Sequence, residues 1–433
     1  MWLALALVLC WQSAPRSADV AQRVAAVLTR VETPDAGAIA AGAAEIASLG
    51  DVAGVLLDAL GSGCVPGDGN GTRLAPGQRT LLLAAVERLG PATLGRFVAE
   101  VARDPASATR VSAALRVLGA THGTPDARAM LALARAAEAR DLAVEDALAE
   151  ALQLAFARSA GNLAALGADW KELGPVSASV AVRALEPLRS DEALACLRSL
   201  LGKRPEYDAL LLGAIGNSLT GGLSSGAAEL VAQDLQPYVR SADGSQAQAA
   251  VAALGRLGEP DSVALLLDVA ESSSAPMRRA AFGALRRLGG VSLPESVDLW
   301  RGWYEREQSW WEERAPARIA ALADDGEVAP ELHQRLALAR ELTEHPLYRD
   351  ELVAAFQPWL AHADPAVRTL ACQALGRLDS PRALAPLCVL LEDDERAVAA
   401  AAHATLAELT RSNPPVRRAA CQEFLSRSGF RID

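Results

Sequence analysis

Aromatic residues are scarce in this 433-residue chain: they make up 4% of it, although apolar residues as a whole make up 51%. A core with so few rings has to be packed mainly with Ala, Leu and Val, which let neighbouring helices approach closely. No segment shows the alternating, β-branched and aromatic pattern that is typical of a strand. The composition therefore favours a helical protein.

An excess of basic residues is also lacking. The chain has 42 Lys and Arg against 53 Asp and Glu, which gives a formal net charge of −11. A nucleic-acid-binding protein needs a basic stripe to neutralise phosphates. We therefore expect no nucleic-acid partner.

Metal-ligating residues are few and scattered. The five histidines form no HExxH motif, and the six cysteines form neither a CxxC pair nor a disulfide framework. Cys372 and Cys388 are expected on consecutive helices, where they could pair, but the simpler interpretation is that both are small buried residues. We expect no metal and no cofactor.

Long hydrophobic runs are absent except for a short one at the start. Residues 3–11 are apolar and are followed by small and polar residues up to Ala18. This pattern resembles a secretory signal peptide and is too short to span a bilayer. It predicts that the mature chain has no membrane span and is exported to the periplasm or the cell exterior. No Lys or Arg precedes the run, so the alternative is a buried first helix in a cytoplasmic protein.

The most informative stretch is 360–409, where one motif occurs twice at a spacing of 31 residues. Its apolar positions fall on one face of a helix. Asp364 can cap that helix, and Pro365 suits its first turn. Such a unit is a helix pair that buries its apolar face only by stacking on neighbours. The apolar positions are Val367, Ala371, Leu375 and Leu378 in the first copy and Val398, Ala402, Leu406 and Leu409 in the second.

The same unit occurs earlier in the chain. Residues 253–257 are identical to residues 374–378, and Leu288 follows Leu257 by 31 residues. The pattern resembles the HEAT repeat family in its Asp-Pro-x-Val-Arg turn, at 364–368, and in its Ala-Leu-Gly-x-Leu ending. The resemblance implies an all-α fold, a right-handed α–α superhelix (HEAT/armadillo-like solenoid). It implies no chemistry, because the residues of this motif are structural.

These features predict four segments. Residues 1–18 are a signal peptide, 19–289 are degenerate HEAT-like repeats, 290–350 are a tryptophan-rich irregular helical segment, and 351–433 are C-terminal HEAT repeats with a capping helix.

The third segment contains four of the eight tryptophans, and its aromatic residues fall within roughly 120° of one helix face. This face either docks on the solenoid, as base rates for aromatic stripes favour, or partly lines a groove for a peptide or glycan. Its Trp-Arg-x-Trp-aromatic sequence resembles exported bacterial HEAT-repeat proteins. The candidate binding residues are Trp300, Trp303, Tyr304, Trp310 and Trp311.

Two functions remain open. The first is a non-catalytic scaffold of the cell envelope that binds a protein or peptide partner through inner helices bearing Arg256, Arg286 and Arg377. The second is an enzyme or enzyme-associated subunit, hydrolase- or lyase-like, with a small pocket near the tryptophan-rich helix. Ser224 stands at the nucleophile position of a G-x-S-x-G sequence, but a helix is expected before it where the nucleophile elbow needs a strand. We therefore expect an ordinary turn at Ser224 and a non-enzymatic protein.

Overall fold

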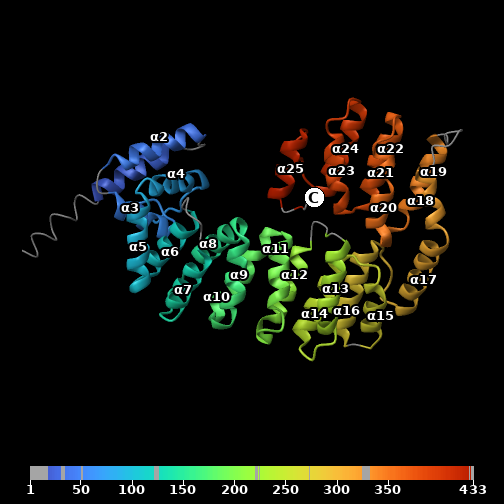
Figure 1. Cartoon of the computed structure of the whole chain (residues 1–433), viewed down its shortest axis with the longest axis horizontal. Helices are drawn as coiled ribbons and strands as arrows, with labels where there is room; N and C mark the ends of the chain where they lie inside the picture. Colours follow the sequence, from blue (N-terminus) through green and yellow to red (C-terminus); the bar gives the residue numbers. More distant parts are fainter. Residues whose placement is uncertain are drawn as a thin grey trace, which may run out of the picture. The chain divides into compact units, whose positions relative to one another are not determined.

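The described part of the chain is almost entirely helical in the computed structural model (Figure 1). Ser224 and all of the predicted signal peptide except Ala18 lie outside this part. Among the helices of the described part, none is both long and apolar enough to cross a membrane. The structure describes residues 18–30, 35–49, 52–120, 126–219, 223, 225–272, 274–323, 332–428 and 430.

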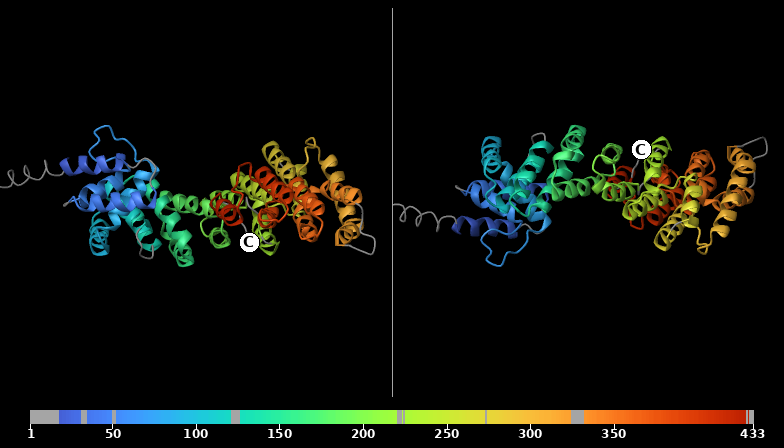
Figure 2. Two further views of the ribbon diagram at one scale, coloured as in Figure 1. Left: turned by 90° about the horizontal axis from the view of Figure 1, so that it is seen from above. Right: turned by 90° about the horizontal axis from the view of Figure 1, so that it is seen from below.

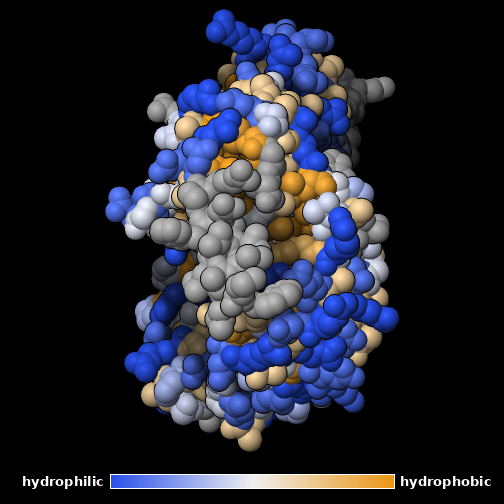
Figure 3. Space-filling view, turned by 90° about the vertical axis from the view of Figure 1, so that its left-hand side faces the viewer, coloured by the Kyte–Doolittle hydropathy of each residue, from blue (hydrophilic) through white to orange (hydrophobic). Residues whose placement is uncertain are grey.

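The helices form two compact units, residues 1–185 and 186–433. In the first unit, residues 18–30 are helical and the following helices pack around a core of Val and Leu side chains. Figure 3 shows one face of the molecule on which hydrophilic residues surround a smaller apolar area. The helices of the first unit are α2 (Ala36–Ala47), α3 (Ala53–Ser62), α4 (Pro76–Glu87), α5 (Pro91–Arg103), α6 (Ala108–Ala120), α7 (Ala127–Glu138), α8 (Glu145–Arg158), α9 (Ala160–Asp169) and α10 (Pro175–Leu185).

The second unit contains the repeat copies at 253–288 and 360–409 described above. Its helices are α11 (Asp191–Leu200), α12 (Asp208–Ser218), α13 (Ser225–Val239), α14 (Gly244–Leu257), α15 (Ser262–Ser272), α16 (Ala275–Gly289), α17 (Val297–Glu313), α18 (Ala315–Ala323), α19 (Leu332–Thr343), α20 (Arg349–Ala355), α21 (Gln357–Leu360), α22 (Pro365–Leu378), α23 (Leu384–Leu390), α24 (Arg396–Thr410) and α25 (Arg418–Arg427). Two short 3-10 turns matter below: η4 (Pro346–Tyr348) before α20, and η5 (Pro381–Ala383) before α23.

Within the second unit, helices stack in two rows. Helices α12, α14 and α16 pack on one another in one row, and α22 packs on α24 in the other. Helices α17, α18 and α19 connect the rows (Figure 1), and Figure 2 shows the stacked helices from two further sides. The predicted all-α solenoid of helix pairs is confirmed. The predicted boundaries at 289/290 and 350/351 stay predictions.

The apolar face that defined the repeat is buried. Val367 is 2% exposed and Val398 is fully buried, as stacking of the pairs requires. Cys372 and Cys388 are also buried, which agrees with their interpretation as small packing residues. The sulfur nearest to Cys388 belongs to Cys421, whose Sγ atom lies 3.4 Å away, so the pair considered from the sequence is replaced by a contact between α23 and α25.

The glycine of the Ala-Leu-Gly ending marks the closest approach between successive helices of a row. A Cβ atom added to Gly255 in α14 would lie 2.6 Å from the Cα atom of Ala284 in α16. In the first unit, the same addition at Gly119 in α6 would lie 2.8 Å from the Cα atom of Ala151 in α8. Both distances are shorter than a carbon–carbon contact of about 3.5–4.0 Å. The small residue is therefore required by the packing of one repeat on the next.

The Asp-Pro-x-Val-Arg turn joins two repeats through its last residue. Asp364 caps α22 by accepting a hydrogen bond from the Ala366 N–H at 2.8 Å, as expected from the sequence. Arg368 donates two hydrogen bonds, of 2.7 and 2.8 Å, to the carboxylate of Asp393 in the following turn. These bonds hold the pKa of Asp393 below its usual range, and the Asp393 side chain is only 8% exposed. The motif thus fixes both the start of a helix and the spacing to the next repeat.

A charged pocket in the second unit

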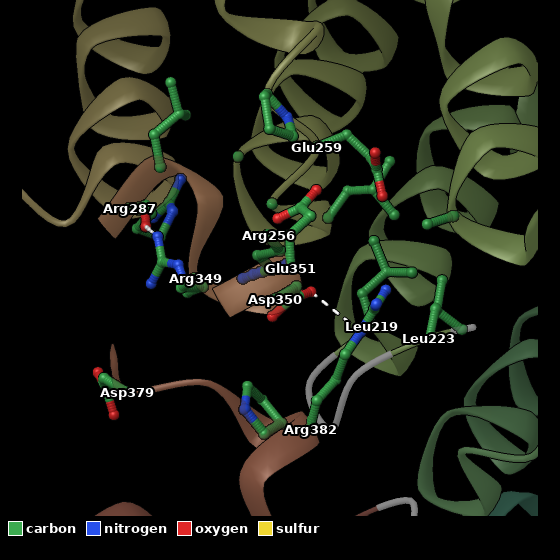
Figure 4. Close-up of a pocket in the computed structure, with 17 residues that line it drawn as sticks. Leu219, Leu223, Arg256, Glu259, Arg287, Arg349, Asp350, Glu351, Asp379 and Arg382 are labelled. Atoms are coloured by element: carbon green, nitrogen blue, oxygen red, sulfur yellow. Dashed lines mark hydrogen bonds and ion pairs between the residues drawn. The ribbon is translucent and has the colours of Figure 1, made fainter. Parts of the chain in front are cut away.

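The two rows of the second unit enclose a pocket between their turns. One wall consists of the ends of α12, α14 and α16, and the other of η4, α20 and the turn between α22 and η5 (Figure 4). The cavity volume is about 130 Å³. That volume corresponds to roughly ten water molecules, which is enough for the end groups of one or two side chains.

Two arginines from successive repeats line the first wall. Arg256 ends α14, and Arg287 occupies the equivalent position 31 residues later, near the end of α16. Their positive charges suit the negative ends of the two helix dipoles. The Nη1 atom of Arg256 donates to the neutral side-chain oxygen of Asn217 at 3.0 Å. The Arg287 side chain makes no hydrogen bond or ion pair among the described residues.

The positive charges of Arg256 and Arg287 repel each other. Loss of hydration lowers the pKa of Arg287, and the nearby charge of Arg256 lowers it further. Arginine stays protonated in proteins, so only the smaller part of this lowering of the pKa, which comes from Arg256, reflects charge repulsion. Neither arginine forms an ion pair among the described residues, although the Glu259 carboxylate lies on the same wall.

A third arginine on the opposite side has a structural role. Arg349, at the start of α20, donates through Nη2 to the backbone carbonyl oxygens of Arg287 and Leu288. These carbonyls belong to the last turn of α16, where such oxygens lack helical partners. Burial lowers the pKa of Arg349, while the carboxylates of Asp350 and Asp379 oppose that change. Arg349 thereby attaches the second row to the first.

The carboxylates of the pocket lie on both walls and are of two kinds. Asp350 is satisfied: it accepts a hydrogen bond of 2.5 Å from the Ser380 hydroxyl and forms an ion pair of 3.2 Å with Arg382. Glu259 and Glu351 have no ion pair among the described residues. Burial raises the pKa of both, and neighbouring carboxylates raise it further: Glu351 does so for Glu259, and Asp350 for both. The charge of Arg382 opposes the rise in both, and a backbone hydrogen bond opposes it in Glu351. The pocket thus contains two carboxylates whose charge is only partly compensated.

The predicted arginine positions agree only in part with this pocket. Arg256 lines it, whereas Arg286 is half-buried and pairs with Glu295 at 3.2 Å, and Arg377 is exposed in the last turn of α22 outside the lining. Sequence reasoning missed Arg287. The 31-residue register from Arg256 leads to Arg287 and could have identified it.

The tryptophan-rich helix α17 uses much of its aromatic face for packing. Trp300 is fully buried and donates through Nε1 to the Pro294 carbonyl at 3.0 Å. Trp303 is 7% exposed, and its ring lies where a Cβ atom on Gly289 would be only 2.6 Å away. These contacts support the docking interpretation for this half of the face. A binding role for these residues stays a prediction.

The other half of the same face forms stacked pairs. Trp310 stacks on His345 with ring centroids 3.5 Å apart, and Trp311 stacks on Tyr348 at 4.2 Å. The His345 ring nitrogen Nδ1 lies 3.3 Å from the carboxylate of the buried Glu307. Trp311 is half-buried, so part of this cluster reaches the surface.

Tyr304, the remaining predicted aromatic residue, is half-buried and accepts a hydrogen bond of 3.0 Å from the Gln308 amide. A role for Tyr304 in binding stays a prediction. Among the described residues, no three His, Cys, Asp or Glu side chains are grouped so that they could hold a metal ion.

Comparison with known families finds a match in the second unit. A family model described as HEAT repeats matches residues 232–323 and 315–407, which together extend from within α13 to within α24. This part of the chain is similar to HEAT repeats. The match includes Arg256, Arg287, Glu259 and Glu351 of the pocket.

Other comparisons add little. No curated protein matches the chain. The solved structure of an engineered protein from a structural genomics consortium is 15% identical, covers 94% of this chain and 92% of its own, and has a TM-score of 0.27. A similarity this low supports no functional argument.

Proposed function

We propose that the protein is a non-catalytic HEAT-repeat scaffold that binds a protein partner in the cell envelope, with the charged pocket of the second unit as the anchoring site. HEAT arrays present successive helix ends as an extended surface, and such surfaces commonly serve in protein binding. The apolar run at residues 3–11 supports export.

One observation carries the proposal: Arg256 and Arg287, both exposed, line one pocket, and neither forms an ion pair among the described residues. Like charges held close together cost free energy in the isolated protein. A partner that supplies the opposite charge removes that cost on binding, and arginine is a frequent anchor residue of interfaces. The enzyme hypothesis gains no comparable observation from the pocket lining.

The test is a pull-down from an envelope extract with the wild-type chain and with the double variant Arg256→Gln, Arg287→Gln. We expect the wild type to enrich a specific protein and the double variant to lose it. Arg286→Gln is the matched control, because Arg286 is adjacent in sequence but pairs with Glu295 outside the pocket. Circular dichroism verifies that all variants are folded. Equal enrichment by the wild type and the double variant would contradict the assignment of the anchor.

A further inference from the structure

We propose that the pocket recognises two opposite charges on one short segment of its partner: a carboxylate that binds between Arg256 and Arg287, and a Lys or Arg side chain that binds at Glu259 and Glu351. The inference rests on the proposed protein-binding function and specifies what the partner has to present.

The anion half follows from the geometry of the first wall. Arg256 and Arg287 come from adjacent helices of one row and face the same cavity. Each guanidinium group carries five N–H donors, of which Arg256 uses one on Asn217. A carboxylate accepts up to about four hydrogen bonds, and charge-assisted bonds to arginine are among the stronger ones. Arg349 does not compete for this role, because it is bound to carbonyl oxygens of α16.

The cation half follows from two carboxylates on opposite walls. Glu259 lies in the turn after α14, and Glu351 lies in the first turn of α20 (Figure 4). Arg382, whose charge lowers the pKa of both, is ion-paired with Asp350. An ammonium or guanidinium group between Glu259 and Glu351 would therefore reduce their mutual repulsion without breaking an existing pair.

The balance of charge favours a ligand with both signs over a ligand with one. The pocket is lined by four arginines and four carboxylates, so a ligand with a single charge meets groups of both signs. A segment with both charges can place each charge next to groups of the opposite sign. The volume of about 130 Å³ accommodates two side-chain ends but not a folded domain, so the charges have to lie close together in the partner sequence. The carboxylate can belong to an Asp or Glu side chain or to a chain terminus.

The experiment measures fluorescence anisotropy of labelled peptides with the full chain at low salt. Three acetylated, amidated hexapeptides carry Asp and Lys, Asp alone, or Lys alone, in an otherwise Gly/Ala sequence. A fourth carries Lys and a free C-terminal carboxylate in place of Asp. We expect one of the two doubly charged peptides to bind at least about tenfold more tightly than either singly charged peptide. Which of the two binds more tightly identifies the source of the carboxylate.

Variants of single pocket residues show which residue binds each charge of the peptide. Arg287→Gln should remove the advantage given by the carboxylate, and Glu351→Gln the advantage given by Lys, while Arg286→Gln should bind as the wild type does. The proposal is overturned if no peptide binds, if a single charge suffices, or if Arg287→Gln has no effect. Such a result leaves the scaffold function open, because the pull-down tests partner binding independently of these peptides.

Discussion

The close approach at Gly255 leads to a quantitative prediction about the stacking of repeats. In an exposed helix, replacing Gly with Ala stabilises the protein by about 1 kcal/mol, because Ala loses less backbone entropy on folding. At Gly255 the added methyl group would lie 2.6 Å from both the Cα and Cβ atoms of Ala284 and 3.0 Å from its carbonyl oxygen. The obstacle is largely backbone, so no rotamer change can relieve it.

Helices α14 and α16 would therefore have to separate by about 1 Å to restore normal contact distances. Overpacking of this kind costs typically 1–3 kcal/mol. After subtraction of the propensity gain of about 1 kcal/mol, we expect Gly255→Ala to destabilise the second unit by up to about 2 kcal/mol. Gly283→Ala, in α16, is the matched control: no atom lies within 4 Å of its added Cβ. It should stabilise the unit by about 0.5–1 kcal/mol.

The assay combines urea unfolding, followed by far-ultraviolet circular dichroism, with hydrogen exchange. Exchange is needed because repeat arrays can unfold in parts, and it reports the local stability of α14 and α16 directly. Faster exchange in these helices should accompany Gly255→Ala alone. The reasoning is refuted if Gly255→Ala is as stable as Gly283→Ala.

Three further predictions concern the C-terminal repeats. Arg368→Ala should lower the free energy of unfolding by about 3 kcal/mol in denaturant titrations, because it leaves the carboxylate of Asp393 buried without its partner. The folded-state pKa of Asp393 is lowered, so its contribution to stability is present above the ordinary Asp pKa and is lost as pH falls through the folded-state value. Asp393→Asn should therefore remove this part of the acid sensitivity in pH-dependent melting curves. Treatment with diamide should oxidise Cys388 and Cys421 to a disulfide, with diamide accepting the two electrons and two protons released. The disulfide is detected by peptide mass spectrometry. The reaction should be slow, because burial raises the pKa of Cys388 to about 12. Cross-linking through Cys372 instead would contradict this contact.

Much of the fold could be predicted because its determinants are local. The 31-residue spacing, the cap at Asp364 and the small residue at Gly376 each act within one repeat or between adjacent repeats. The same register leads to Arg287 as the counterpart of Arg256. The sequence predicts an aromatic face on one side of α17, but the stacking of Trp311 on Tyr348 depends on which segment lies opposite and could not be derived from the sequence.

The sequence by itself determined that the chain forms helix pairs, where those pairs begin, and which face of each is buried, since periodicity and capping operate over a few residues. Only the tertiary structure decided that Glu259 and Arg287 share a pocket with Glu351, which belongs to a repeat more than sixty residues later in the chain. The direction of the second row depends on the packing angles of α17, α18 and α19, and small changes in those angles accumulate along the array. A repeat motif specifies contacts between neighbours and leaves this longer-range geometry open.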